Sequence, residues 1–402
     1  MQHLESLIDV YGEPDSLIDS YEEDSKRYAI WGFNEVFEVN SKGCFLNDSI
    51  IDGDPLLIFQ KILNQWKLDK KNDLLAAVGF ISYEFKNILY KHINFKNTDS
   101  HFPFLWFGKP KLIKEYSINI ELKERKGALE LVNDIIDIHK YKQKINLIKS
   151  HLKKGNAYQI NLTDKKLFYS SYSNAYQLYD VLRSQAKPKE GFFLKNNNFN
   201  ILSLSPESFI KVNNNIIETL PIKGTRPRSD NKLEDKLFKL ALKDSIKDKA
   251  EHLMIVDLLR NDLGKICQTG SIKVDDLYAI QSFETIHHMV TKITGKLTQN
   301  ISESDIIKAL FPGGSITGAP KESAMKIIDS LESQSRNIYT GSAGYICPNG
   351  NMAFNICIRT LLQSRDVYEY GVGGGIVWDS IAEEEWDEAQ QKSKILNSLI
   401  TV

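Results

Sequence analysis

A lysine between a proline and a glycine is the first candidate for chemistry in this sequence. Lys223 lies in the segment Pro221-Ile-Lys-Gly-Thr-Arg-Pro-Arg228, directly after an expected strand. The proline stiffens the approach, and the glycine lets another group come close to the backbone. A solvated lysine in a turn is the ordinary explanation for such a residue. The neighbouring glycine, threonine and arginines are residue types that bind anions, so Lys223 is also a candidate for a functional site.

Acidic residues gather at two expected helices. In Glu251-His-Leu-Met-Ile-Val-Asp-Leu-Leu-Arg-Asn-Asp262, the spacing places Glu251 at the head of an apolar stripe. A carboxylate there is costly unless it is paired or bound to a metal. The dipole of a helix N-terminus would also stabilise it, so the spacing leaves both explanations open. Glu385 and Glu388 crowd the start of a later helix with the same ambiguity, and carboxylates from two helices would together form an oxygen-rich site suited to Mg²⁺.

Two glycine-rich segments could lie close to a ligand. Pro312-Gly-Gly-Ser-Ile-Thr-Gly-Ala-Pro-Lys321 opens an expected helix, where free backbone N–H groups and hydroxyls form an anion cradle. It is not a Walker A loop, because Ala-Pro-Lys stands where Gly-Lys-Ser/Thr is required, and a carboxylate fits as well as a phosphate. Gly371-Val-Gly-Gly-Gly375 follows a strand but precedes no helix, so it is not a dinucleotide fingerprint.

The elements that must position these residues come in blocks of strands and blocks of helices. The segments GFFLK, ILSLS, SFIKV and IIETL predict a β-meander in the middle of the chain. Helical patterns follow over about 232–262 and 320–331, then a hairpin at Pro348-Asn-Gly350, a glycine-rich strand and a last helix over about 382–399. This order indicates an α+β fold, with antiparallel sheets that form a sandwich-like core flanked by helices.

The first part of the chain carries no evident chemistry. Residues 1–140 alternate strand-like and helical segments, and we interpret them as a supporting subdomain interleaved with the core. Residues 141–402 contain the candidate residues, and we interpret them as the binding and catalytic region.

Composition and charge predict a soluble, cytoplasmic protein. Of the 402 residues, 51 are Lys or Arg and 52 are Asp or Glu, so the formal net charge is −1. This balance gives no reason to expect a nucleic acid or a membrane surface as partner. The four cysteines form no CxxC pair, which argues against a disulfide framework or a zinc site. No signal-peptide pattern and no apolar run of membrane-spanning length is found.

Taken together, the polar segments resemble the chorismate-utilising enzymes, a family that includes anthranilate, aminodeoxychorismate, isochorismate and salicylate synthases. The match runs from about Tyr158 to the end of the chain, and its motifs occur in the family order. They are YQINLT, SPESF, PIKGTRPR, EHLMIVDLLRND, FPGGSITGAPK, YTGSAGY, NICIRT, GVGGGIVWDS and EEEWDEA. The N-terminal part matches only loosely, for instance in GFISYEFKN.

The resemblance implies a Mg²⁺ site that holds the ring carboxylate of chorismate. Its direct ligands would be Glu251 and Glu388, with Glu385 acting through water. The catalytic residues that the resemblance implies are Lys223, Glu207 and His288, although a histidine alone is a weak signal. The substrate contacts that it implies are Gly224, Thr225, Ser315, Tyr339, Arg359, Gly373, Gly374 and Gly375.

Two positions distinguish members of the family. Members that add water carry a lysine base where this chain has Gln159, and glutamine cannot take a proton from water at neutral pH. At the position of Lys223, anthranilate synthases have alanine and aminodeoxychorismate synthases have lysine. We therefore expect a Mg²⁺-dependent enzyme that aminates C4 of chorismate, with Lys223 as nucleophile. Anthranilate formation is one alternative, and an inactive chorismate-binding subunit that regulates a glutaminase is another.

No segment of the sequence resembles a glutaminase with its nucleophilic cysteine. The resemblance therefore implies a separate glutaminase subunit that delivers ammonia from glutamine, and a place in 4-aminobenzoate and folate biosynthesis.

Overall fold

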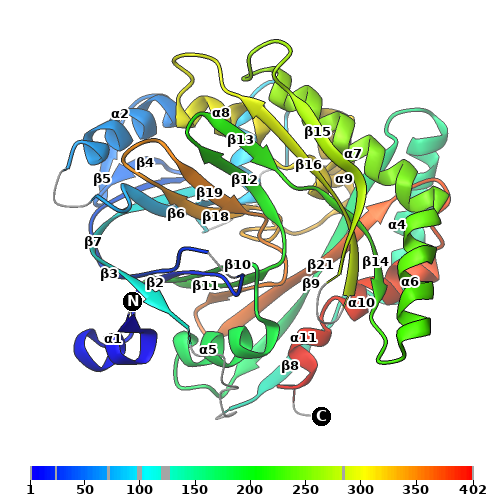
Figure 1. Ribbon diagram of the computed structural model, residues 1–402, viewed down its shortest axis with the longest axis horizontal. Helices are drawn as coiled ribbons and strands as arrows, with labels where there is room; N and C mark the ends of the chain where they lie inside the picture. Colours follow the sequence, from blue (N-terminus) through cyan, green and yellow to red (C-terminus); the bar gives the residue numbers. More distant parts are fainter. Residues whose placement is uncertain are drawn as a thin grey trace.

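The strands of this protein lie in two layers that face each other, with helices on both outer sides (Figure 1). The computed structural model describes residues 2–22, 25–69, 73–96, 102–118, 127–282 and 286–400. In Figure 1, α2 (Pro55–Lys67) and α8 (Glu303–Leu310) cover one side of the layers, and α5 (Ala175–Ala186) covers the other. This is the α+β sandwich that the sequence predicts.

Antiparallel pairing joins most strands into one continuous network. The order of neighbours is β14 (Ile222–Pro227), β16 (Ile286–Lys296), β13 (Ile216–Thr219), β12 (Ser208–Asn213), β19 (Met352–Asn355), β18 (Ser342–Ile346), β6 (Ala77–Ile81), β7 (Leu105–Ser117), β3 (Tyr28–Asn40), β2 (Ser16–Asp19), β10 (Glu190–Lys195), β11 (Phe199–Ser205), β20 (Thr360–Ser364), β21 (Val367–Ile376) and β9 (Gln159–Ser170). Strands from the first third of the chain thus lie between strands of its later part.

Shorter or lateral strands complete the network. β15 (Lys273–Ser282) pairs with β16, whereas β8 (Leu129–Asn133) and β17 (Gly318–Ala319) pair with β9. β4 (Gly43–Leu46) lies between β3 and β5 (Ser49–Ile51), and β1 (Gln2–His3) runs parallel to β7.

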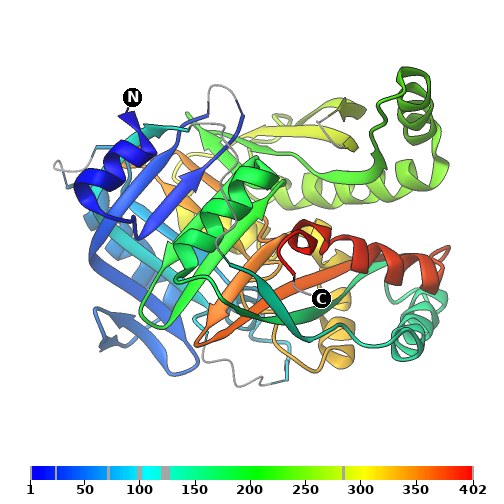
Figure 2. The same cartoon turned by 90° about the horizontal axis from the view of Figure 1, so that it is seen from below.

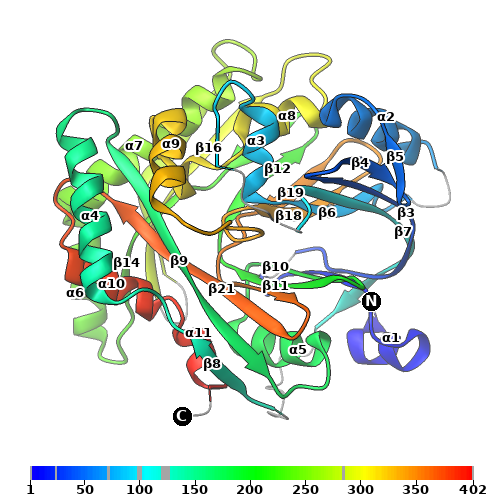
Figure 3. The same cartoon turned by 180° about the vertical axis from the view of Figure 1, so that it is seen from behind.

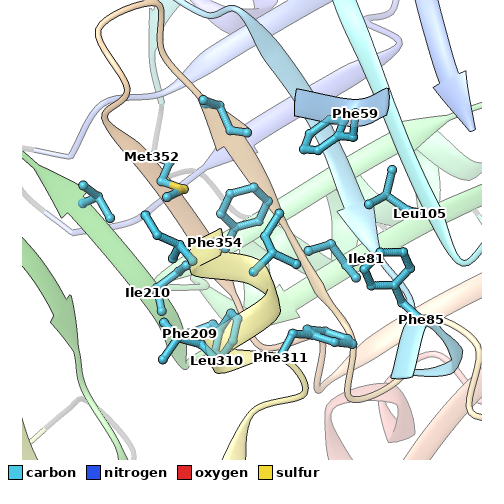
Figure 4. Packing of buried hydrophobic residues seen from close by; sticks show 14 of the residues in the cluster. Phe59, Ile81, Phe85, Leu105, Phe209, Ile210, Leu310, Phe311, Met352 and Phe354 are labelled. Carbon is cyan, nitrogen blue, oxygen red and sulfur yellow. The ribbon is translucent and has the colours of Figure 1, made fainter. Parts of the chain in front are cut away.

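Alternate residues of one strand pack into different cores, because successive side chains of a strand point to opposite faces. In β6, Val78 and Phe80 belong to the core between the two layers, whereas Ala77 and Ile81 belong to the core beneath α2 and α8. Both faces of this strand are therefore buried. Figure 4 shows the second of these cores, where Phe59 of α2 and Leu310 of α8 meet side chains of the sheet.

Two arms project from the sandwich to the same side (Figure 2). One arm contains β14, β15 and β16 with α6 (Lys232–Asp244) and α7 (Ile246–Gly264). The other contains β9 and β21 with α4 (Ile138–Lys153) and α10 (Ala382–Gln391). From behind, α4 and α9 (Lys321–Leu331) are seen over β9 (Figure 3), and the three share one apolar cluster. The remaining helical segments are α1 (Leu4–Tyr11), η1 (Tyr83–Phe85), α3 (Lys86–Leu89), η2 (Gly314–Ile316) and α11 (Lys394–Asn397).

The helical pattern over about 232–262 is confirmed and forms two helices, since the Ser245 side chain accepts a hydrogen bond from the Asp248 N–H and starts α7. Two other expectations about these elements were wrong in detail. The last helix is likewise divided into α10 and α11. The expected meander is interrupted, since β11 pairs with β20 and β12 with β19, instead of with each other.

Among the described residues, no helix combines the length and the apolar character that crossing a membrane would require.

Candidate active site

A cavity of about 680 Å³ lies between the two arms. Every residue for which the family resemblance implies a role lines this cavity, namely Glu207, Lys223, Gly224, Thr225, Glu251, His288, Ser315, Tyr339, Arg359, Gly373, Gly374, Gly375, Glu385 and Glu388. They come from both arms and from the loops between them. The volume is that of a site for a small organic ligand.

A bulge in β14 brings Lys223 and Thr225 to the cavity wall. The register of β14 against β16 shifts between these two residues, and Gly224 between them has a φ of 74°. A Cβ atom at Gly224 would lie 2.8 Å from the Leu242 side chain and 3.0 Å from Asp248 Oδ1. Only glycine fits both the left-handed backbone and this close approach.

Lys223 lies in a partly buried and mostly acidic setting. Burial lowers the pKa of its ammonium group, while the carboxylates of Glu251 and Glu207 act in the opposite direction. Its Nζ donates a hydrogen bond of 3.4 Å to the backbone carbonyl of Ser315. A lowered pKa increases the fraction of neutral amine, which is the nucleophilic form of lysine.

Glu207 lies between β11 and β12, beside the same loop. Burial raises the pKa of its carboxyl group to about 7, although the charge of Lys223 and a hydrogen bond from Ser315 oppose this rise. The Ser315 hydroxyl donates that bond to Oε1 at 3.0 Å. Glu207 can therefore hold or release a proton near neutral pH, as general acid–base chemistry requires.

The two adjacent histidines face different surroundings. His288 Nδ1 lies 3.0 Å from the Thr225 hydroxyl, and burial lowers the pKa of His288 to about 4, so its ring is neutral at pH 7. His287 points elsewhere, with its ring nitrogens 2.9 Å from the Ser282 hydroxyl and 3.0 Å from Asp235. Only His288 lines the cavity.

Carboxylates from α7 and α10 line the same cavity. Burial raises the pKa values of Glu251 and Glu385, and the charge of Glu385 adds to the effect at Glu251. Partial desolvation has the same tendency at Glu388, but Lys392, Lys223 and Lys247 together outweigh it and lower the pKa of Glu388. A divalent cation such as Mg²⁺ would relieve the repulsion between Glu251 and Glu385. Carboxylate oxygens are also the hard donors that this ion prefers. In the part of the chain that the structure describes, however, no three acidic, His or Cys side chains lie close enough to hold a metal ion in this conformation.

The glycines of β21 make room for neighbouring side chains. A Cβ atom at Gly371 would lie 2.1 Å from Tyr339 Cγ, so the tyrosine ring rests directly on the strand. A Cβ atom at Gly375 would lie 2.4 Å from Gln159 Nε2 and 3.4 Å from Lys223 Nζ. The absence of side chains here lets the backbone of β21 form part of the wall.

The position of Arg359 results from a break between two strands, which the sequence did not predict. The segment MAFNICIRTLLQS reads as one strand, but it forms β19 and β20 with an irregular piece between them. Arg359 in this piece has a φ of 51°. The break places Arg359 on the cavity wall, near enough for its charge to contribute to the lowered pKa of His288.

Lys392 is a cavity residue that sequence reasoning missed. Its Nζ lies 2.8 Å from Glu388 Oε1 and donates a hydrogen bond of 2.6 Å to the Gly373 carbonyl. The i,i+4 spacing from Glu388 was an available signal. Other cavity residues without such a signal include Asn161, Lys247, Asp248, Tyr370 and Gln391.

The model of the chorismate binding enzyme family matches residues 113–398. This chain belongs to that family. It is 44% identical over 261 residues to the aminodeoxychorismate synthase component 1 of Escherichia coli, a match that covers 64% of this chain and 57% of that one. It is 33% identical over 368 residues to the anthranilate synthase component 1 of Saccharolobus solfataricus, a match that covers 88% of this chain and 87% of the other.

Solved structures of chorismate-utilising enzymes share the fold. The anthranilate synthase component I of Streptococcus pneumoniae superposes with a TM-score of 0.80 at 23% identity, covering 93% of both chains. The menaquinone-specific isochorismate synthase of Escherichia coli superposes with a TM-score of 0.74 at 17% identity, covering 96% of this chain and 88% of that one. At these identities, the likeness establishes the fold of this family member.

Proposed function

We propose that this chorismate binding enzyme is the component I of an aminodeoxychorismate synthase, which converts chorismate and ammonia to 4-amino-4-deoxychorismate. The observation that carries the proposal is the position of Lys223, a partly buried lysine with a lowered pKa on the wall of the cavity. The relatives named aminodeoxychorismate synthase component 1 support it. The match covers little more than half the length of those relatives, so the activity of the whole protein is part of the proposal.

Two displacements would carry the reaction. The neutral amine of Lys223 attacks C2 of chorismate, both conjugated double bonds of the ring shift, and the C4 hydroxyl leaves as water with a proton from Glu207. Ammonia then attacks C4, both double bonds shift back, and the bond between C2 and the lysine nitrogen breaks. The released proton returns to Glu207, and the enolpyruvyl ether stays intact throughout.

The remaining residues of the wall would bind and orient the substrate. Tyr339, Arg359 and the backbone of Gly373–Gly375 are proposed to hold its carboxylates, with Gly224, Thr225, Ser315 and His288 beside the ring. Glu251 and Glu388 would hold Mg²⁺, with Glu385 in support through water. When bound, Mg²⁺ would neutralise and position the ring carboxylate.

A second subunit is part of this proposal. The relatives are named as component 1 of their synthases, and we infer that a separate glutaminase supplies the ammonia. The product would then serve the formation of 4-aminobenzoate for folate.

Anthranilate synthesis is the second candidate function. A specific observation favours it, because the anthranilate synthase component 1 of Saccharolobus solfataricus matches along most of both chains. From another class, an inactive subunit that binds chorismate and regulates a glutaminase would share the same cavity.

Identification of the product formed from chorismate distinguishes these three candidate functions. The pure chain is mixed with chorismate, Mg²⁺ and ammonium at mildly alkaline pH, and the product is identified by mass and chromatography. Aminodeoxychorismate is the expected product. Anthranilate would replace the proposal with the second candidate. If no product forms even with a glutaminase and glutamine, and calorimetry still detects chorismate binding, the inactive subunit is the better description.

A further inference from the structure

A buried arginine behind the cavity makes an unusually complete set of contacts. Arg336 lies between α9 and β18, outside the cavity wall, and its side chain is 2% exposed. It carries a full charge at every accessible pH. A buried charge of this kind is costly unless hydrogen bonds and an opposite charge compensate for it.

All five N–H donors of the guanidinium group are used. Nε and Nη2 donate to the two carboxylate oxygens of Glu332, each at 2.8 Å. Nη1 donates to the Ile316 carbonyl at 3.0 Å and to the Thr340 hydroxyl at 3.2 Å. Nη2 also donates to the Asn161 carbonyl at 2.8 Å. A lysine has three donors on one nitrogen and cannot reach so many separate acceptors.

These acceptors belong to three segments that line the cavity. Ile316 follows Ser315, which contacts Glu207 and Lys223. Thr340 directly follows Tyr339, which lines the cavity. The third acceptor is the backbone carbonyl of Asn161, and Asn161 also lines the cavity. One guanidinium group therefore fixes the loop at η2, the start of the β18 segment and β9 relative to one another.

Glu332, the carboxylate partner of Arg336, connects this arginine to a further strand of the cavity wall. Glu332 Oε1 accepts hydrogen bonds from the Thr163 N–H at 3.0 Å and from the Thr163 hydroxyl at 2.8 Å. Thr163 lies opposite Gly373 in the pairing of β9 with β21. Glu332 thus connects Arg336 to the glycine-rich strand of the wall.

The first part of the chain holds Arg336 from the other side. The Arg336 backbone N–H donates to Glu84 Oε1 at 2.8 Å, and the guanidinium carbon lies 4.3 Å from the centre of the Tyr83 ring. Tyr83 and Glu84 lie in η1, within the segment GFISYEFKN. This segment of the first part of the chain makes direct contact with the group that supports the catalytic wall.

We infer that Arg336 is a positioning residue for the proposed reaction, held by Tyr83 and Glu84 and acting through Ser315, Tyr339 and β9. Its removal would leave the chemical groups of the cavity in place but loosen their mutual distances. A displacement of about 1 Å can cost on the order of 10²-fold in rate. The inference rests on the proposed function for its rate measurements, but its binding measurement requires only chorismate.

The chain offers a matched control in Arg183. This arginine is also buried, and it pairs with Asp19 at 3.0 Å and with Asp180 at 2.6 Å. It lies in α5, which packs against the sandwich, and it does not line the cavity. Replacement of either arginine by lysine should reduce stability, which makes stability alone an uninformative readout.

The test compares Arg336→Lys with Arg183→Lys in the full chain. Thermal melting identifies the temperature range in which both variants are folded, and all rates are measured within it. We expect Arg336→Lys to lower kcat for amination by about tenfold to 10²-fold and to weaken chorismate binding in calorimetry. Arg183→Lys should keep both values within about twofold. Glu84→Gln should give a smaller effect of the same kind, because it weakens only the backbone contact of Arg336.

Two results would overturn the inference. One is a folded Arg336→Lys variant whose kcat and chorismate affinity equal those of the wild type. The other is an equal loss of kcat in both arginine variants, which would indicate a general effect of stability. If the wild-type chain makes no aminodeoxychorismate, the proposed function fails, but calorimetry with chorismate still decides whether Arg336 positions the wall.

Discussion

Ser315 contacts Glu207 through its hydroxyl, at 3.0 Å, and uses its backbone carbonyl to accept a hydrogen bond from Lys223. One residue thus touches both the proposed proton donor and the proposed nucleophile. The hydroxyl favours the charged form of Glu207, whereas burial favours the neutral form and raises the pKa to about 7.

Removal of the Ser315 hydroxyl should change the pH dependence of the reaction. In Ser315→Ala, the bond that lowers the pKa of Glu207 is lost, so this pKa should rise above its wild-type value. If the protonated form is the acid, kcat/KM for chorismate falls as pH rises through this pKa. The descending limb of the pH profile of kcat/KM should therefore move to higher pH, when the concentration of free ammonia is held constant. Ser330→Ala removes a serine whose hydroxyl binds only the Ile327 carbonyl, and it should leave the limb unchanged.

Glu207→Gln should remove this limb altogether. Glutamine has a similar shape but cannot donate a carboxyl proton, so we expect kcat to fall by about 10²- to 10⁴-fold. The measurement is a pH profile of kcat/KM for chorismate. A variant that keeps the wild-type profile would show that another group titrates.

Lys223→Ala should separate the two candidate functions. Without its nucleophile, amination at C4 should fall by about 10²-fold or more, whereas formation of anthranilate should be spared or become detectable. Product analysis by mass and chromatography provides the test. Lys247→Ala, at another cavity lysine, is the control and should not change which product forms. Unchanged aminodeoxychorismate formation in Lys223→Ala would falsify the covalent route.

The acidic residues of α7 and α10 should contribute differently to metal binding. Glu388→Gln and Glu251→Gln should weaken Mg²⁺ binding in the presence of chorismate by about 10- to 100-fold, measured by calorimetry. Glu383 lies on the same helix but is exposed and pairs with Lys142. Glu383→Gln should therefore keep the wild-type affinity. Equal losses in all three variants would indicate a general effect of charge and no specific site.

A buried ion pair should matter for stability. Lys321 Nζ lies 2.6 Å from Asp262 and donates to the Leu310 carbonyl at 2.9 Å, and both charged side chains are buried. Among the described residues, Lys321→Ala leaves Asp262 with one ion-pair partner, the exposed Lys265, and should lower the free energy of unfolding by about 3–5 kcal/mol. Lys265→Ala should lower it by less than about 1 kcal/mol. Denaturant titrations compare the two, and similar losses would contradict the prediction.

The fold class and the members of the candidate site were accessible from the sequence because they depend on local patterns. Strand periodicity, the hairpin at Pro348 and ordered motifs such as PIKGTRPR lie in short segments. The strand neighbours were not accessible, since β6 pairs with β18 and β2 with β10 across long stretches of chain. The role of Lys392 and the contacts of Arg336 also depend on this tertiary arrangement, because their partners come from β21, β9 and η2.

The pairing of early with late strands has a consequence for biosynthesis. β6 (Ala77–Ile81) leaves the ribosome long before its neighbour β18 (Ser342–Ile346) is translated. At about 5–20 residues per second, the wait is on the order of tens of seconds. During this time one edge of an apolar strand has no partner within the chain, which exposes it to aggregation. Production of the enzyme should therefore respond to chaperone supply and to translation speed more strongly than that of a protein whose strands pair in sequential order.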